Sequence, residues 1–170
     1  MKIEQKKWTK EEGWKNISTT MTSVNQPQMV LVFGGSSLVR EEKVFNEVKE
    51  KYPSSHVLMM STAGEILDTN VSDGTLSLTA IYFEKTELTF VELDITNSEE
   101  SLSLGEKLAK SLHTEKLVHV MVFSDGLKVN GTALVSGITN NLPENVALTG
   151  GLVGDGADFK HTYLGLDKTP

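Results

Sequence analysis

The chain has 170 residues, no cysteine and four prolines, and 38% of its residues are hydrophobic. This length fits one domain, or one domain with a short appendage, and the composition excludes both a disulfide-stapled scaffold and a disordered chain. The 16 Lys and Arg residues against 23 Asp and Glu give a net charge of −7, which makes nucleic acid a poor partner.

The first 28 residues differ in charge from the rest of the chain, because they hold five lysines against three glutamates. We treat residues 1–28 as an N-terminal extension and residues 29–170 as the main domain. We expect the extension to be a strand or helix that packs Trp8 and Trp14 on the main domain. The alternative is a partly ordered binding arm.

From residue 29 the pattern becomes regular. The apolar run Met29–Phe33 predicts a buried strand that ends in the small-residue segment Gly34–Ser37. Apolar residues then recur at helical spacing from Leu38 to Tyr52. A second strand over residues 56–60 runs into the segment Ser61–Glu65.

The two alternating segments 76–83 and 88–95 are separated by a short link and predict an antiparallel hairpin. Asn97 and Glu100 have the spacing of a capping box at the start of a helix.

Further elements follow towards the C-terminus. They are a strand over 116–123, a helix around 134–142, a strand that becomes a glycine loop over 146–159, and a last strand over 161–167. The sequence therefore predicts an α/β fold, with a mixed β-sheet flanked by helices, βαβ units and a central antiparallel hairpin.

Four predicted strands each end in a segment of small residues. Ligands of open α/β sheets bind at the carboxyl ends of strands, where glycine lets backbone N–H groups approach a ligand. Tight turns are the alternative explanation for each segment taken alone. The four segments are Gly34–Ser37, Ser61–Glu65, Ser124–Gly126 and Gly150–Gly156.

Several kinds of site are not indicated. The sequence has no P-loop and no dinucleotide fingerprint, so we expect no nucleotide cofactor, and it has no G-x-S-x-G motif for a serine nucleophile. Its histidines are scattered and follow no metal-binding spacing; they are His56, His113, His119 and His161. No apolar run is long enough to span a membrane, and the N-terminus has no signal-peptide core, so we expect a cytoplasmic location.

Charged candidates remain at the strand ends. Arg40 is the only arginine, so an anion would be held by backbone N–H groups, lysine or Arg40. The candidate acidic residues either bind a cation or an amine, act as acid and base, or cap local turns. They are Glu65, Asp125, Asp155 and Asp158.

Three motifs together resemble a known family. They are STAGEI at Ser61–Ile66, SDGLKVNGTAL at Ser124–Leu134 and GGLVGDGADFKHT at Gly150–Thr162. Their order and spacing are similar to the N-terminal half of the FIST proteins, the F-box and intracellular signal transduction proteins, over about residues 29–166. The chain departs from the family pattern at Met59 and Met60, where Gly-Cys is usual, and at Val153, where a small residue is usual.

The resemblance implies a sensory domain for small ligands such as amino acids. It also implies a signalling output domain or partner protein, and a C-terminal FIST domain that usually follows; the sequence ends soon after the last motif, so we expect it to represent one half of a longer protein. Carried over by position, the ligand-binding candidates are Ser61, Thr62, Glu65, Ser124, Asp125, Asn130, Gly151, Gly154 and Asp155. Gly35, Ser36 and Arg40 join them from the first strand-end segment.

Our first hypothesis is thus a ligand-binding domain without catalysis, with the anionic end of the ligand on the glycine loops and Arg40. An amino group would bind Glu65, Asp125 or Asp155. The alternatives are a cation-dependent hydrolase that uses Asp125, Asp155 and Asp158, or a protein-interaction scaffold with an exposed apolar patch. We expect no nucleic acid as a partner and no membrane insertion.

Overall fold

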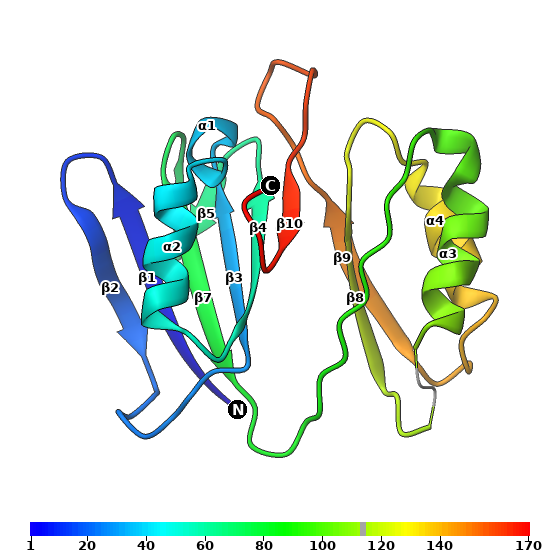
Figure 1. Cartoon of the computed structure of the whole chain (residues 1–170), viewed down its shortest axis with the longest axis horizontal. Coiled ribbons are helices and arrows are strands. Elements are labelled where there is room, and N and C mark those ends of the chain that lie inside the picture. Colours follow the sequence, from blue (N-terminus) through cyan, green and yellow to red (C-terminus); the bar gives the residue numbers. More distant parts are fainter. Residues whose placement is uncertain (113–114) are drawn as a thin grey trace. The chain divides into compact units, whose positions relative to one another are not determined.

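The computed structural model describes residues 1–112 and 115–170. His113, one of the four histidines for which the sequence indicates no metal site, lies outside the described residues. The chain forms two compact units (Figure 1). Unit 1 comprises Met1–Leu88 and Val153–Pro170, and unit 2 comprises Thr89–Leu152. Among the described residues, no helix is both long and apolar enough to cross a membrane.

Unit 1 is built on a six-stranded mixed sheet with the strand order β10-β4-β3-β7-β1-β2. Only β3 and β4 are parallel to each other, and every other neighbouring pair is antiparallel. The strands are β1 (Lys2–Thr9), β2 (Gly13–Thr19), β3 (Met29–Gly34), β4 (His56–Ser61), β7 (Leu76–Tyr82) and β10 (Leu164–Leu166).

Two helices connect β3 to β4. They are α1 (Ser36–Val39) and α2 (Glu42–Lys51), so the predicted helix is interrupted at Arg40 and Glu41. The apolar face of α2 packs on the sheet through Val44 and Val48, which join Val30, Val32 and other strand residues in the core of unit 1. A separate two-stranded ribbon is formed by β5 (Glu65–Leu67) and β6 (Asn70–Ser72).

The N-terminal 28 residues contribute two strands to this sheet. β1 lies between β2 and β7, and it is antiparallel to both. Trp8 and Trp14 face each other across β1 and β2 and pack, partly buried, against the core of unit 1. The first 28 residues are therefore integral to the sheet in this structure.

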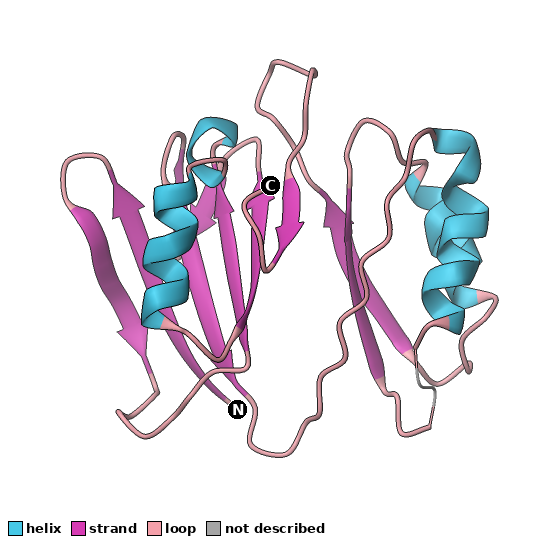
Figure 2. Cartoon of the chain, viewed as in Figure 1, coloured by secondary structure: helices cyan, strands magenta, loops and turns pink. Residues whose placement is uncertain are grey.

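The predicted central hairpin is wrong. Its first strand forms as β7, but residues 88–95 form no strand and run as loop (Figure 2). The reason is that β7 is an interior strand, whose two edges are paired with β3 and β1. No hydrogen-bonding edge of β7 is left for residues 88–95.

Unit 2 contains two helices and a parallel two-stranded sheet. The elements are η1 (Ser98–Glu100), α3 (Ser101–Lys110), β8 (His119–Ser124), α4 (Gly131–Thr139) and β9 (Ala147–Leu152). Its core is formed by Leu104, Val129, Leu134 and Ile138, against which Val122 of β8 packs.

The two helices of unit 2 approach each other through glycines. A Cβ atom on Gly137 would lie 2.2 Å from the carbonyl oxygen of Leu102, and one on Gly105 would lie 2.4 Å from that of Leu134. Any side chain at either glycine would therefore separate α3 from α4.

Candidate functional site

The carboxyl ends of β3 and β4 lie side by side in unit 1, as the sequence predicted for the first two strand-end segments. Gly34 and Ser61 are partners in the parallel register, and the Thr62 N–H donates to the Gly34 carbonyl at 3.0 Å. The Gly35 N–H donates to the carbonyl of Thr75 at 3.4 Å. A Cβ atom on Gly34 would lie 2.8 Å from that same oxygen, so glycine is needed for this approach.

Glu65 holds this region together. Its side chain is buried, with 3% of the residue exposed. One carboxylate oxygen accepts a hydrogen bond from the Thr62 hydroxyl at 2.6 Å, and the other accepts from both the backbone N–H (3.1 Å) and the hydroxyl (3.0 Å) of Thr75. Glu65 therefore joins the end of β4 to the start of β7.

Ser61 is likewise engaged within the fold. It is 1% exposed, and its hydroxyl accepts from the Tyr163 N–H at 2.8 Å. The Ser61 carbonyl accepts from the Gly154 N–H at 3.0 Å, and a Cβ atom on Gly154 would lie 3.2 Å from the nitrogen of Ala63. The first and last family motifs thus meet in unit 1.

Ser36 and Arg40 differ from Ser61 and Glu65 because their side chains make no hydrogen bond among the described residues. The Ser36 hydroxyl oxygen is buried and has no hydrogen-bond partner among the described residues. Four residues later, the exposed Arg40 places its guanidinium 4.7 Å from the centre of the Tyr163 ring. Buried hydroxyls normally have a partner, which a protein group, a water molecule or a ligand can supply.

Asp155 folds its own loop. Its carboxylate accepts from the backbone N–H groups of Lys160 (2.6 Å), His161 (3.0 Å) and Phe159 (3.2 Å). The bond from Lys160, supported by the other two, holds the pKa of the Asp155 carboxyl below its usual range. This is the turn-capping arrangement, one of the three alternatives that the sequence leaves open for this residue.

The remaining candidates belong to unit 2. Ser124 ends β8, and the Asp125 carboxylate accepts from the N–H groups of Leu127 (2.7 Å) and Lys128 (2.6 Å). The side chain of Asn130 caps α4 by accepting from the Ala133 N–H at 3.1 Å.

Gly151 is exposed in β9, and nothing lies within 4 Å of a Cβ atom built on it. Its neighbour Gly150 has a positive φ of 147°, and a Cβ atom there would lie 1.7 Å from the carbonyl oxygen of Val122. The glycine requirement in β9 is therefore at Gly150, which pairs closely with β8.

The candidates thus fall into two groups, one in each unit. Gly35, Ser36, Arg40, Ser61, Thr62, Glu65, Gly154 and Asp155 belong to unit 1, and Ser124, Asp125, Asn130 and Gly151 belong to unit 2. A single site shared by both groups stays a prediction.

The acidic residues of the metal-dependent alternative do not form one cluster among the described residues. The described residues contain no group of three or more His, Asp or Glu side chains that could hold a metal ion. The carboxylates of Asp125 and Asp155 are already bonded to N–H groups of their own loops, and Asp158 is exposed.

Sequence reasoning missed two residues of this region. Thr75 supplies two of the three hydrogen bonds to Glu65, and Tyr163 contacts both Ser61 and Arg40. Thr75 follows the predicted Asp73-Gly74 turn, but the turn signal gives no indication of a partner ten residues earlier. Tyr163 lies just before the short strand β10 and carries no motif signal.

The two departures from the family pattern fill the core. Met59 and Met60 are both fully buried in β4, and Val153 is 6% exposed. Methionine adapts to irregular spaces in a core, so the strand end is packed with side chains where the family usually has Gly-Cys.

The strands and helices described above define an α/β domain. The model of the FIST N domain matches residues 28–170, and the chain belongs to the FIST family. No curated protein and no solved structure matches the chain.

Proposed function

We propose that the chain is a sensory domain that binds a small polar metabolite, such as an amino acid, within a signal-transduction protein. Membership of the FIST family supports the signalling role. The hydroxyl of Ser36, at the start of α1, has no partner among the described residues; it supports a bound ligand and is the observation that carries the proposal. A buried hydroxyl without a partner costs about 1–3 kcal/mol, and a ligand oxygen or amine at this position would recover part of that loss.

The anionic end of the ligand is the part that this region is best equipped to recognise. Arg40 is exposed and lies over the Tyr163 ring, which leaves the edges of its guanidinium available for a carboxylate. The carboxylates of Glu65 and Asp155 are held by donors of their own unit. We therefore assign these two residues to shaping the loops and not to binding an amino group.

Binding would signal by favouring one conformation over another. Glu65 links the segments after β4 and before β7, and the Gly154 N–H links the last family motif to Ser61. A ligand that contacts the loop after β3 would bias the packing of both segments. The proposal includes no catalytic step, in keeping with the engaged carboxylates of Asp125 and Asp155.

Thermal unfolding of the chain in the presence of single amino acids and other small carboxylates tests this function. A ligand at 100 times its dissociation constant stabilises the folded state by about 2.7 kcal/mol, which is readily seen as a rise in Tm. If no small carboxylate or amino acid raises Tm, and calorimetry detects no heat of binding, the proposal fails.

A protein-interaction surface is the second candidate function. Ile66 and Val71 face each other across the ribbon β5–β6, and they are 73% and 72% exposed. An exposed apolar pair on a ribbon that follows the motif STAGEI favours contact with another protein. Replacing both residues by threonine would remove this contact while leaving the metabolite-induced rise in Tm unchanged.

A further inference from the structure

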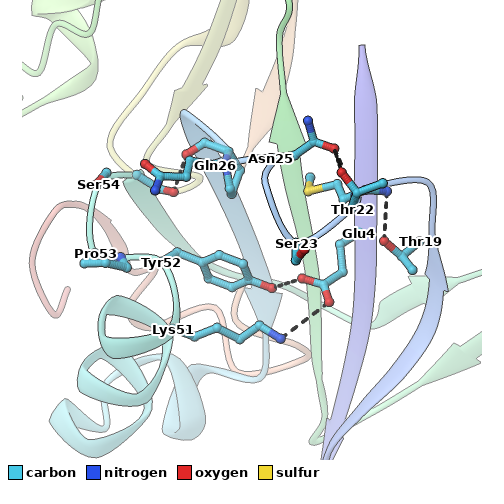
Figure 3. A pocket seen from close by; sticks show the side chains of 13 residues that line it. Glu4, Thr19, Thr22, Ser23, Asn25, Gln26, Lys51, Tyr52, Pro53 and Ser54 are labelled. Atoms are coloured by element: carbon cyan, nitrogen blue, oxygen red, sulfur yellow. Dashed lines mark hydrogen bonds and ion pairs between the residues drawn. The ribbon is translucent and has the colours of Figure 1, made fainter.

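A cavity of about 410 Å³ lies in unit 1 at the end of the sheet away from the family motifs. Its walls come from the start of β1, the segment between β2 and β3, and the end of α2 with the residues that follow (Figure 3). β1 and β3 both enter the sheet here, whereas the motif loops follow the last residues of β3 and β4. Its size lies within the range of roughly 300–1,000 Å³ that is usual for small-molecule sites.

The floor of the cavity is a charged group held in place by the fold. The side chain of Glu4 is 15% exposed, and one of its carboxylate oxygens accepts from the Tyr52 hydroxyl at 2.5 Å (Figure 3). Burial, followed by the hydrogen bond to Glu4, raises the pKa of Tyr52, so its hydroxyl stays a donor at neutral pH. The hydroxyl of Ser55, which follows α2, donates to the carbonyl of Pro27, which lies between β2 and β3, at 2.6 Å. This hydrogen bond joins two of the segments that line the cavity.

The other carboxylate oxygen of Glu4 makes two long ion pairs. It lies 3.4 Å from the Lys51 ammonium and 3.8 Å from that of Lys6. A charge-assisted hydrogen bond is usually about 2.7–2.9 Å long, so both ion pairs are loose. The two ammonium groups nevertheless outnumber the single carboxylate of Glu4, so the floor carries no net negative charge.

The rim supplies neutral groups that can both donate and accept. The side chains of Ser23, Gln26 and Ser54 line the cavity and make no hydrogen bond to the described residues. The side-chain oxygen of Asn25 accepts from the Thr22 hydroxyl at 3.0 Å. The NH₂ group of Asn25 points away from Thr22 and can donate to another group (Figure 3).

We propose that this cavity binds a small, uncharged, polyhydroxylated ligand of monosaccharide size. Each hydroxyl of such a ligand donates one hydrogen bond and accepts others, which matches a rim of hydroxyl and amide groups. Two neighbouring hydroxyls would bridge the loose ion pair on the floor, one donating to Glu4 and the other accepting from Lys51. A cationic ligand fits less well, because Glu4 already has two ammonium groups beside it and no other carboxylate of the described residues lines the cavity to pair with an added positive charge.

NMR titration of the whole chain, labelled with ¹⁵N, tests this proposal with glucose, galactose, ribose and inositol as probes. Saturable shifts of backbone amides in segments 22–26 and 51–55 are expected at millimolar concentrations. Gln26→Ala and Ser54→Ala remove exposed groups that the fold does not use, and Glu4→Gln removes the charged acceptor. Loss of one ligand hydrogen bond weakens binding by about tenfold. Glu50→Gln, on the exposed face of α2, is the matched control and should bind as the wild type does.

The outcomes separate this site from the proposed sensory site. If a monosaccharide binds and Gln26→Ala or Ser54→Ala weakens that binding, the polyol site is supported. These two variants suffice even if the Glu4→Gln protein does not fold. The absence of saturable shifts in these two segments with every probe overturns it. Shifts there with amino acids and not with sugars also overturn it, whereas amino-acid shifts confined to residues 35–40 concern the sensory site alone.

Discussion

Glu65 and Thr75 are joined by two hydrogen bonds, because one carboxylate oxygen of Glu65 accepts from both the backbone N–H and the hydroxyl of Thr75. The other oxygen accepts from Thr62. Glu65, a residue of the family motif STAGEI, therefore connects the end of β4 to the start of β7 by hydrogen bonds. A ligand bound near Ser36 would meet loops whose positions this carboxylate determines.

Glu65→Gln should destabilise the protein. An amide at this buried position has only one acceptor oxygen, so at least one of the three donors from Thr62 and Thr75 loses its partner. We expect the free energy of unfolding to fall by about 1–3 kcal/mol, measured by urea denaturation. Glu11→Gln, at an exposed turn, is the control and should change it by less than about 0.5 kcal/mol. Equal urea midpoints for the two variants would contradict the role assigned to Glu65.

Arg40→Gln should weaken binding of the small carboxylate by about tenfold or more, since hydrogen bonds to charged groups contribute about 1.5–3 kcal/mol. The variant loses only an exposed contact with the Tyr163 ring, so its stability should change by about 0.5–1 kcal/mol at most. Lys43→Gln removes the same charge from the exposed side of α2 and should leave affinity unchanged. Calorimetry with the ligand found by thermal unfolding measures the affinity of the wild type and of both variants. Equal losses of affinity in the two variants would indicate a general charge effect and not a direct contact with Arg40.

Lys6 should make stability depend on pH under alkaline conditions. Burial, together with the nearby Lys51 ammonium, lowers the pKa of Lys6 from 10.5 to about 8. Between these two values the unfolded chain binds the proton that the folded protein has released, so stability rises with pH, by at most about 1.4 kcal/mol per pH unit.

Urea midpoints measured from about pH 7 to pH 9 check this expectation, below the range in which most tyrosines titrate. Lys6→Met should abolish most of the rise, whereas Lys10→Met, at an exposed position in the first turn, should retain it. The same rise in all three proteins would assign it to other groups.

Gly137→Ala should destabilise unit 2, because the new methyl group would lie 2.2 Å from the Leu102 carbonyl of the facing helix. Backbone atoms cannot rotate away as a side chain can, and overpacking of this kind costs about 1–3 kcal/mol or more. Gly151→Ala is the matched comparison in the same unit, since its methyl group would meet nothing within 4 Å. Circular dichroism during thermal unfolding should show a lower Tm for Gly137→Ala alone.

Much of the fold could be predicted from local patterns. The apolar run at residues 29–33 forms β3, and the segments at 56–60 and 76–83 form β4 and β7 almost as predicted. Residues 88–95 alternate in the same way and yet form no strand. A strand pattern records which side chains suit a sheet, and it cannot record whether a neighbouring strand has a free edge.

The candidate site shows the same division. Glycine motifs at the ends of β3 and β4 indicated correctly that these loops lie together. The motif residues Ser61, Glu65 and Asp155 stay predicted ligand contacts, and in the structure each of them also accepts hydrogen bonds from groups of the protein itself. Small polar residues at strand ends serve equally as turn caps and as ligand contacts, so residue type alone does not separate the two roles.

The family follows from three motifs in order along the chain, and the α/β class follows from the succession of apolar runs and helical spacings. Both depend on residues close together in the chain. Three other features are seen only in the three-dimensional structure: the first two strands complete the sheet beside β7, Ser61 meets Tyr163 across 102 positions, and Glu4 and Tyr52 form the floor of a cavity. These features arise from hydrogen bonds and packing between segments far apart in the chain, and no local pattern of residues encodes which distant segment will be the partner.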